Sequence, residues 1–146
     1  MSTPLRKRDD ATADPKQLIL DQLGDLSGVE IANNEVLIAT YMRPEMTAGG
    51  IVLPHQNLKE DQYQGKVGLV VKIGVACRFE RIDAHTGVKF GIPIALHDWV
   101  VVRTSDTWTL EVNGRTNSSD PREFVKCRLV FDDQIRMKVP RPGMVW

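Results

Sequence analysis

The chain has 146 residues, of which 42% are hydrophobic and 26% are charged. This balance predicts one packed domain with appendages and excludes a fibrous or wholly disordered protein. Its 19 Lys and Arg residues balance 19 Asp and Glu residues, so net charge gives no reason to expect a nucleic-acid or membrane partner. The start lacks the apolar run of a signal peptide and no segment reaches membrane-spanning length, which predicts a cytoplasmic protein or one assembled in a cytoplasm.

Residues 1–29 are predicted to form an arm followed by a short helix. The basic cluster at 6–8 stands beside acidic residues, which favours a solvated arm; the alternative is an arm that docks on an acidic partner surface. Asp14 and Pro15 are typical of a helix start, because Asp caps free backbone N–H groups and proline fits the first helical position. Apolar residues at helical spacing, with glycines after them, predict a helix over 15–23.

From residue 30 the pattern becomes that of β-structure. Gly68 within the second predicted strand indicates a bulge or a barrel corner, and regular structure is expected to end at Pro140. Short strands at near-regular spacing predict an all-β fold, either a small barrel or a sandwich. The predicted strands are 35–42, 65–74, 97–103, 107–112, 123–131 and 135–139, with a hairpin within 75–95 around residues 84–87 and loops over 46–64 and 113–121.

The sequence contains no pattern typical of an enzyme. The three histidines are scattered, and no nucleotide-binding, hydrolase or metalloprotease motif is found. Asp98, Asp132 and Asp133 are interpreted as turn residues, although their convergence around a metal ion would indicate a small hydrolase. We therefore expect no catalytic site, no metal and no cofactor.

The two cysteines and three tryptophans are interpreted as structural. Cys77 and Cys127 lie outside any metal-binding spacing, which favours two half-buried thiols in a reducing compartment over a disulfide. Trp99 and Trp108 fall in predicted strands, so they are expected in the core or on a sheet face.

One segment suggests a mechanism. Gly49 and Gly50 give the backbone conformational freedom, and the apolar triplet Ile51, Val52 and Leu53 follows directly, ahead of a polar stretch. The triplet could enter a strand and pack inside the protein. The functional alternative is a mobile loop that presents three apolar side chains to a groove on a partner.

At this segment the sequence resembles the GroES-type co-chaperonins. The segment 48–54 reads Ala-Gly-Gly-Ile-Val-Leu-Pro and is preceded by a Val-Leu-Ile-Ala strand at 36–39. The segments 64–74, 97–101 and 127–139 are similar to later strands of that family. The resemblance covers roughly residues 30–139, with an insertion at about 104–125, and leaves 140–146 as a tail.

The resemblance implies an irregular β-barrel that assembles as a heptameric dome and caps a chaperonin ring. Ile51, Val52 and Leu53 would then contact the chaperonin, Gly49 and Gly50 would form the hinge, and residues 75–95 would match the hairpin that roofs the dome. A loop that becomes ordered on binding binds weakly by itself, but several copies on one ring raise the avidity by ~10²–10⁴.

The sequence also departs from this family. It carries an N-terminal extension, the insertion and the longer tail, as divergent bacteriophage members do. The alternative function is therefore a bacteriophage virion protein, such as a head-decoration, neck or connector component, in which the barrel is a homo-oligomeric assembly scaffold and the termini clamp neighbouring capsid or neck proteins.

Overall fold

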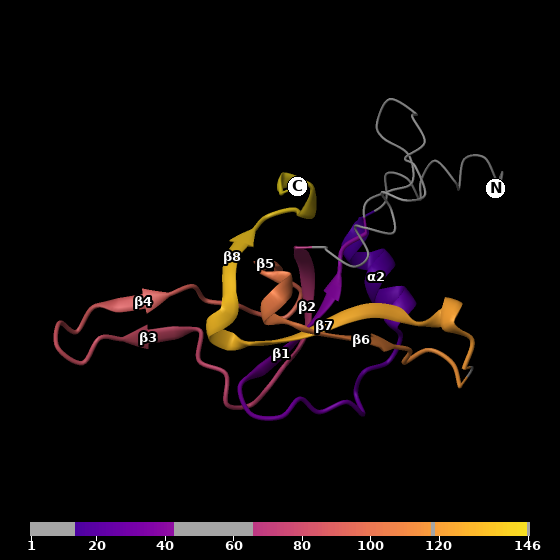
Figure 1. Ribbon diagram of the computed structural model, residues 1–146, viewed down its shortest axis with the longest axis horizontal. Coiled ribbons are helices and arrows are strands. Elements are labelled where there is room, and N and C mark those ends of the chain that lie inside the picture. Colours follow the sequence, from indigo (N-terminus) through magenta and orange to yellow (C-terminus); the bar gives the residue numbers. More distant parts are fainter. Residues whose placement is uncertain (1–13, 43–65, 118, 146) are drawn as a thin grey trace.

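The structure is a computed structural model that describes residues 14–42, 66–117 and 119–145. These residues form one α-helix, a six-stranded antiparallel sheet and a separate two-stranded hairpin (Figure 1), which confirms the predicted all-β fold with a short N-terminal helix. The elements are α2 (Pro15–Leu23), β1 (Glu35–Thr40), β2 (Val67–Ile73), β3 (Glu80–Ile82), β4 (Lys89–Gly91), β5 (Trp99–Val102), β6 (Trp108–Val112), β7 (Val125–Phe131) and β8 (Ile135–Val139), with short 3₁₀ turns η1 (Thr104–Asp106), η2 (Pro121–Glu123), η3 (Asp132–Gln134) and η4 (Pro142–Met144).

The six strands follow the order β6-β7-β1-β2-β5-β8, and the connection between β7 and β8 requires this sheet to curl. Neighbouring strands lie about 4.8 Å apart, so a flat sheet would separate β7 from β8 by roughly 19 Å. The chain from Phe131 to Ile135 reaches at most roughly 14 Å even when extended. The sheet therefore bends into a small barrel that is open between its edges β6 and β8, and β7 and β8 run in clearly different directions (Figure 1).

Two register shifts accompany the bending, one between β1 and β2 and one between β5 and β8. Between β1 and β2, Leu37 pairs with Lys72 but Ile38 pairs with Val70, so Val71 is an extra residue on β2. The bulge thus lies at Val71 and not at Gly68, and the alternative prediction for Gly68, a barrel corner, stays a prediction. Gly68 has a packing role, because a Cβ there would lie 3.1 Å from the Ala39 carbonyl oxygen.

The core covers both faces of the central strand β1. Val36 and Ile38 pack with β5 residues on one face, and Leu37 and Ala39 pack with Trp99 and the helix on the other. Alternate side chains of a strand point to opposite faces, so a strand that is buried on both faces is apolar throughout. This explains the continuous Val-Leu-Ile-Ala run of β1.

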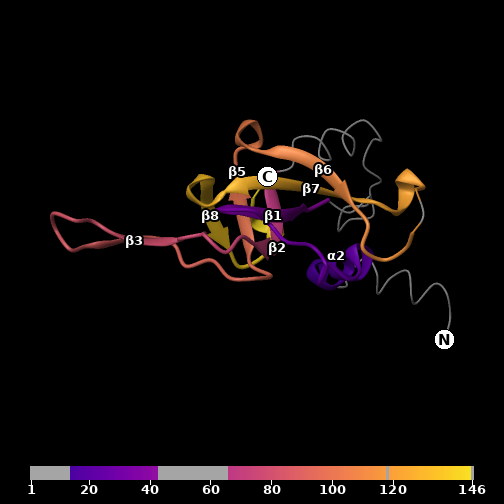
Figure 2. The same cartoon turned by 90° about the horizontal axis from the view of Figure 1, so that it is seen from below.

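The helix α2 has the bounds predicted from the sequence. The Asp14 side chain accepts a hydrogen bond from the Lys16 backbone N–H at 3.1 Å. Gly24 ends the helix with φ 76°, a conformation that glycine adopts without steric cost. The helix buries Ile19 and Leu23 against the sheet, and Figure 2 shows it on one side of the β1–β7 layer.

The remaining strand predictions are confirmed to within two residues at each end, and one detail differs. A further turn, η4, follows Pro140, where the sequence predicted the end of regular structure. Trp99 is buried in the core and Trp108, which is 67% exposed, lies in the edge strand β6 of the sheet, so both agree with the predicted core or sheet-face positions. The predicted insertion thus contributes β6 to the sheet, paired with β7.

Candidate functional site

The two ends of the segment that contains Gly49, Gly50, Ile51, Val52 and Leu53 are held side by side by the sheet. These five residues lie outside the described part of the chain. Before the segment, Thr40 pairs with Gly68, and the Tyr41 N–H donates to the Val67 carbonyl oxygen at 2.9 Å. Paired antiparallel strands need only a few connecting residues, so residues 42–66 form a connection far longer than the sheet requires.

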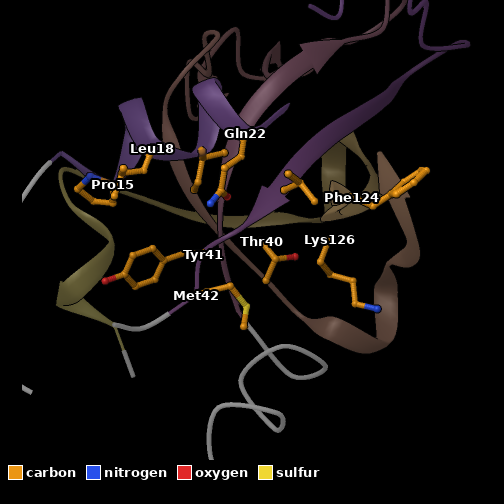
Figure 3. A pocket seen from close by; sticks show the side chains of 10 residues that line it. Pro15, Leu18, Gln22, Thr40, Tyr41, Met42, Phe124 and Lys126 are labelled. Carbon is orange, nitrogen blue, oxygen red and sulfur yellow. The ribbon is translucent and has the colours of Figure 1, made fainter. Parts of the chain in front are cut away.

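A pocket of about 260 Å³ lies beside this base, between α2, the end of β1 and the start of β7 (Figure 3). Leu18 and Met42 are partly exposed at the pocket. The Thr40 hydroxyl is buried there without a hydrogen-bond partner among the described residues. The volume is below the range of about 300–1,000 Å³ typical of small-molecule sites. Its lining residues are Pro15, Leu18, Ile19, Gln22, Thr40, Tyr41, Met42, Phe124, Val125 and Lys126.

Aromatic packing fixes the end of β1 next to this pocket. The rings of Tyr41 and Trp99 meet edge-to-face with their centroids 5.7 Å apart, a favourable geometry for an aromatic pair. The start of the long connection is therefore supported by the core through Trp99.

The β3–β4 hairpin is the second candidate site. It projects from the barrel in both views (Figures 1 and 2), and every residue of β3 and β4 is exposed. Among these residues, Ile82 is 64% and Phe90 is 53% exposed. A two-stranded hairpin is at best marginally stable alone in water, so this hairpin needs contacts with other residues to stay folded.

Asp132 supplies the support at the root. Its side chain is 1% exposed and accepts hydrogen bonds from the Arg78 backbone N–H at 2.7 Å and from the Asn34 side-chain amide at 3.1 Å. The Arg81 guanidinium lies 3.4 Å away. Burial raises the pKa of Asp132, but the two hydrogen bonds and the charge of Arg81 together outweigh it, so the pKa lies below its ordinary value. The interpretation of Asp132 as a turn residue alone was therefore incomplete.

The acidic residues do not converge on a metal site. Asp98 accepts a hydrogen bond from the Ala95 N–H at 2.9 Å and lies 3.4 Å from the Lys138 ammonium, whereas Asp132 ties the hairpin root to η3. The described residues contain no group of three His, Cys, Asp or Glu side chains that could hold a metal ion. The carboxylates thus have structural partners at two separate places.

Both cysteines are free thiols, and neither has the properties of a reactive nucleophile. Burial raises the pKa of Cys127 to about 12. Burial and the nearby charge of Asp132 also raise the pKa of Cys77, whereas a nucleophilic thiol requires a lowered pKa.

Sequence reasoning missed two features that the fold creates. Arg128 is a fully buried cation whose guanidinium donates to the Thr107 hydroxyl at 2.9 Å, linking β7 to the start of β6. The exposure of the apolar side chains of Val88, Phe90 and Ile92 at the hairpin was also missed.

Comparison with known proteins gives no family for this chain. No family model matches it, and a search of the curated proteins finds no matching sequence. In the part of the chain that the structure describes, no helix combines the length and apolar character needed to cross a membrane.

Proposed function

We propose that this protein is a co-chaperonin of the GroES type, which caps a chaperonin ring through the segment between β1 and β2. The observation that carries the proposal is the long connection over residues 42–66, which leaves and re-enters the barrel at two directly paired strands. A β-barrel gives such a segment a fixed base, and long connections in compact domains are usually functional or disordered.

In this proposal Ile51, Val52 and Leu53 bind an apolar groove on the chaperonin, while Gly49 and Gly50 allow the backbone to adapt. The described residues are consistent with a binding module, since Asp98 and Asp132 accept hydrogen bonds within the fold and the Cys127 thiol is buried. Several weak contacts from copies of one ring would give a cap that binds tightly and still dissociates.

The test is complex formation with a bacterial chaperonin ring in the presence of ATP, measured by size-exclusion chromatography. We expect ATP-dependent co-elution of the unchanged protein and its loss in the double variant Ile51→Ser, Val52→Ser. The matched control is Leu58→Ser, which removes an apolar residue of the same segment outside the triplet and should leave co-elution unchanged.

Thermal unfolding of each variant separates binding from folding. Co-elution lost in a double variant with an unchanged melting temperature supports the proposal. Absence of co-elution by the unchanged protein, or a double variant that unfolds, would instead mean that the triplet is part of the core.

The second candidate is a bacteriophage virion protein that uses the barrel as an assembly scaffold. The observation that favours it is Trp108, which is 67% exposed on the edge strand β6, since exposed aromatic residues are enriched at protein interfaces. Co-sedimentation of the protein with assembled particles, abolished by Trp108→Ser and not by the chaperonin-segment variant, would support this candidate.

A further inference from the structure

The strand β6 forms one edge of the six-stranded sheet (Figure 2). Its inner side pairs with β7 over all five residues without a register shift, and no other strand among the described residues pairs with its outer side. A strand in this position presents a row of backbone N–H and C=O groups that can pair with another chain. The outer edge of β6 is therefore a template for a further extended segment.

The two edges of the sheet differ in their protection against such pairing. In the other edge strand, β8, the side chains of Arg136 and Lys138 are 57% and 40% exposed, and β8 has a register shift against β5. Exposed basic side chains and bulges are two means by which proteins block edge strands. The sequence of β6, Trp-Thr-Leu-Glu-Val, has no basic residue and no proline, and its pairing has no bulge. The edge at β6 is therefore the less protected of the two.

One face of β6 continues the core and ends at an exposed tryptophan. Alternate residues of a strand share a face, so Trp108, Leu110 and Val112 lie together. Leu110 and Val112 pack against the core, as does Leu129, the cross-strand partner of Trp108. The Trp108 side chain itself is 67% exposed. An added strand with an apolar residue on this face would cover the Trp108 ring and extend the apolar face by one strand.

The opposite face of β6 carries a negative charge. The Glu111 side chain is 46% exposed and lies 3.8 Å from the Lys126 ammonium of β7. Opposite charges in cross-strand pairs are favourable, and like charges are unfavourable. The charge of β6 therefore complements a strand that has a lysine or arginine opposite Glu111. It does not complement a second β6, which has no basic residue.

Two contacts hold the chain directly before β6 in place. The Arg128 guanidinium of β7 donates to the Thr107 hydroxyl at 2.9 Å, and the Arg136 guanidinium of β8 lies 3.4 Å from the Asp106 carboxylate. The start of β6 is thus fixed by both of these strands. A binding edge that is already ordered loses less conformational entropy when its partner binds.

We propose that the outer edge of β6 binds an extended peptide segment of another protein, which adds to the sheet as a further strand. The segment has apolar side chains on the face of Trp108 and a basic side chain opposite Glu111. Backbone hydrogen bonds supply the affinity, and the alternating side chains supply the specificity. The site goes beyond the proposed function and does not depend on it, because it lies outside the connection between β1 and β2 and its test contains no chaperonin.

The experiment uses the full chain and two capped synthetic peptides in which valine alternates with threonine around a central lysine or a central glutamate. Hydrogen exchange locates the bound peptide, and titration of a fluorescently labelled peptide measures the Kd. We expect the lysine peptide to protect amides of Trp108–Val112 and not those of Ile135–Val139. It should bind roughly two- to five-fold more tightly than the glutamate peptide, and Glu111→Gln should remove this preference.

Two further comparisons separate strand addition from other contacts. Trp108→Ser should weaken binding of the lysine peptide by roughly tenfold, whereas the matched control Met137→Ser, which removes a 47% exposed apolar side chain from the other edge strand, should leave it unchanged. Peptides methylated on alternate backbone nitrogens, prepared in both phases, test the hydrogen bonds, and one of the two phases should lose binding. Circular dichroism melts check that the protein variants are folded.

Four results would overturn the proposal. The first is binding that survives N-methylation in both phases, because side chains alone would then hold the peptide. The second is protection that appears at β8 or at the β3–β4 hairpin in place of β6. The third is the absence of protection at millimolar peptide. The fourth is protection of β6 that rises with protein concentration without any peptide, which would assign this edge to a second copy of the chain.

Discussion

At the scale of single residues, Asp132 connects distant parts of the chain. It is a buried carboxylate that joins η3 to the hairpin root through Arg78 and Arg81 and to the start of β1 through Asn34. A buried group of this kind stabilises the fold only while its partners are present, because each donor left without an acceptor costs about 1–3 kcal/mol.

We expect Asp132→Asn to lower the free energy of unfolding by roughly 1–3 kcal/mol at neutral pH, since the amide cannot balance the charge of Arg81 and turns a donor toward other donors. Urea unfolding followed by circular dichroism measures the change. Asp133→Asn is the control, because Asp133 is its exposed neighbour, and it should change the free energy little.

The pH dependence follows from the lowered pKa of Asp132. A group whose folded-state pKa is depressed contributes stability above its unfolded pKa and loses it as the pH falls through the folded pKa. The stability difference between the unchanged protein and Asp132→Asn should therefore be constant at neutral pH and shrink below the ordinary value of 3.8. A difference that stays constant down to pH 2 would show that Asp132 acts without its charge.

At the scale of elements, α2 depends on its ends as well as on its buried face. The helix has an exposed outer face and buries Ile19 and Leu23. The Asp14 cap therefore supplies part of the modest free energy that stabilises this helix. The Gly24 backbone ends the helix and lies against Gly114, which ties this element to the segment after β6.

We expect Asp14→Ala to lower the free energy of unfolding by about 0.5–2 kcal/mol, because it removes the acceptor for the Lys16 N–H. Chemical denaturation checks the value. Gln22→Ala, at an exposed position in the last turn of the same helix, is the control. An equal loss of stability in that variant would mean that the exposed helix surface, and not the cap, is responsible.

At the scale of the whole molecule, the barrel and the hairpin should differ in local stability. β1 is paired on both sides and buried on both faces, whereas β3 and β4 pair only with each other among the described strands and are exposed. Regions with few buried contacts open with a lower free energy than the core.

Native-state hydrogen exchange measures this difference. The amides of Val36–Ala39 should exchange only through global unfolding, and those of Glu80–Ile82 should exchange much faster. Protection of the hairpin equal to that of β1 would contradict the division between barrel and hairpin.

The sequence by itself determined the elements of this protein, because their signals are local. Asp14 and Pro15 predict the start of α2, and the alternating and apolar runs predict the strands, including Ile135–Val139 with its observed bounds. The apolar triplet at 51–53 and the resemblance to co-chaperonins also come from sequence alone, and the triplet lies outside the described residues.

The tertiary structure alone decided which residues meet. The bulge at Val71, the exposure of Trp108 and the burial of Asp132 depend on strand order and curvature, which are set by contacts between residues far apart in the chain. Asp132 lies 98 positions from Asn34, and no local pattern encodes such a distance. The position of the hairpin outside the core likewise depends on where the barrel ends, so the exposure of Ile82 and Phe90 is known only from the folded chain.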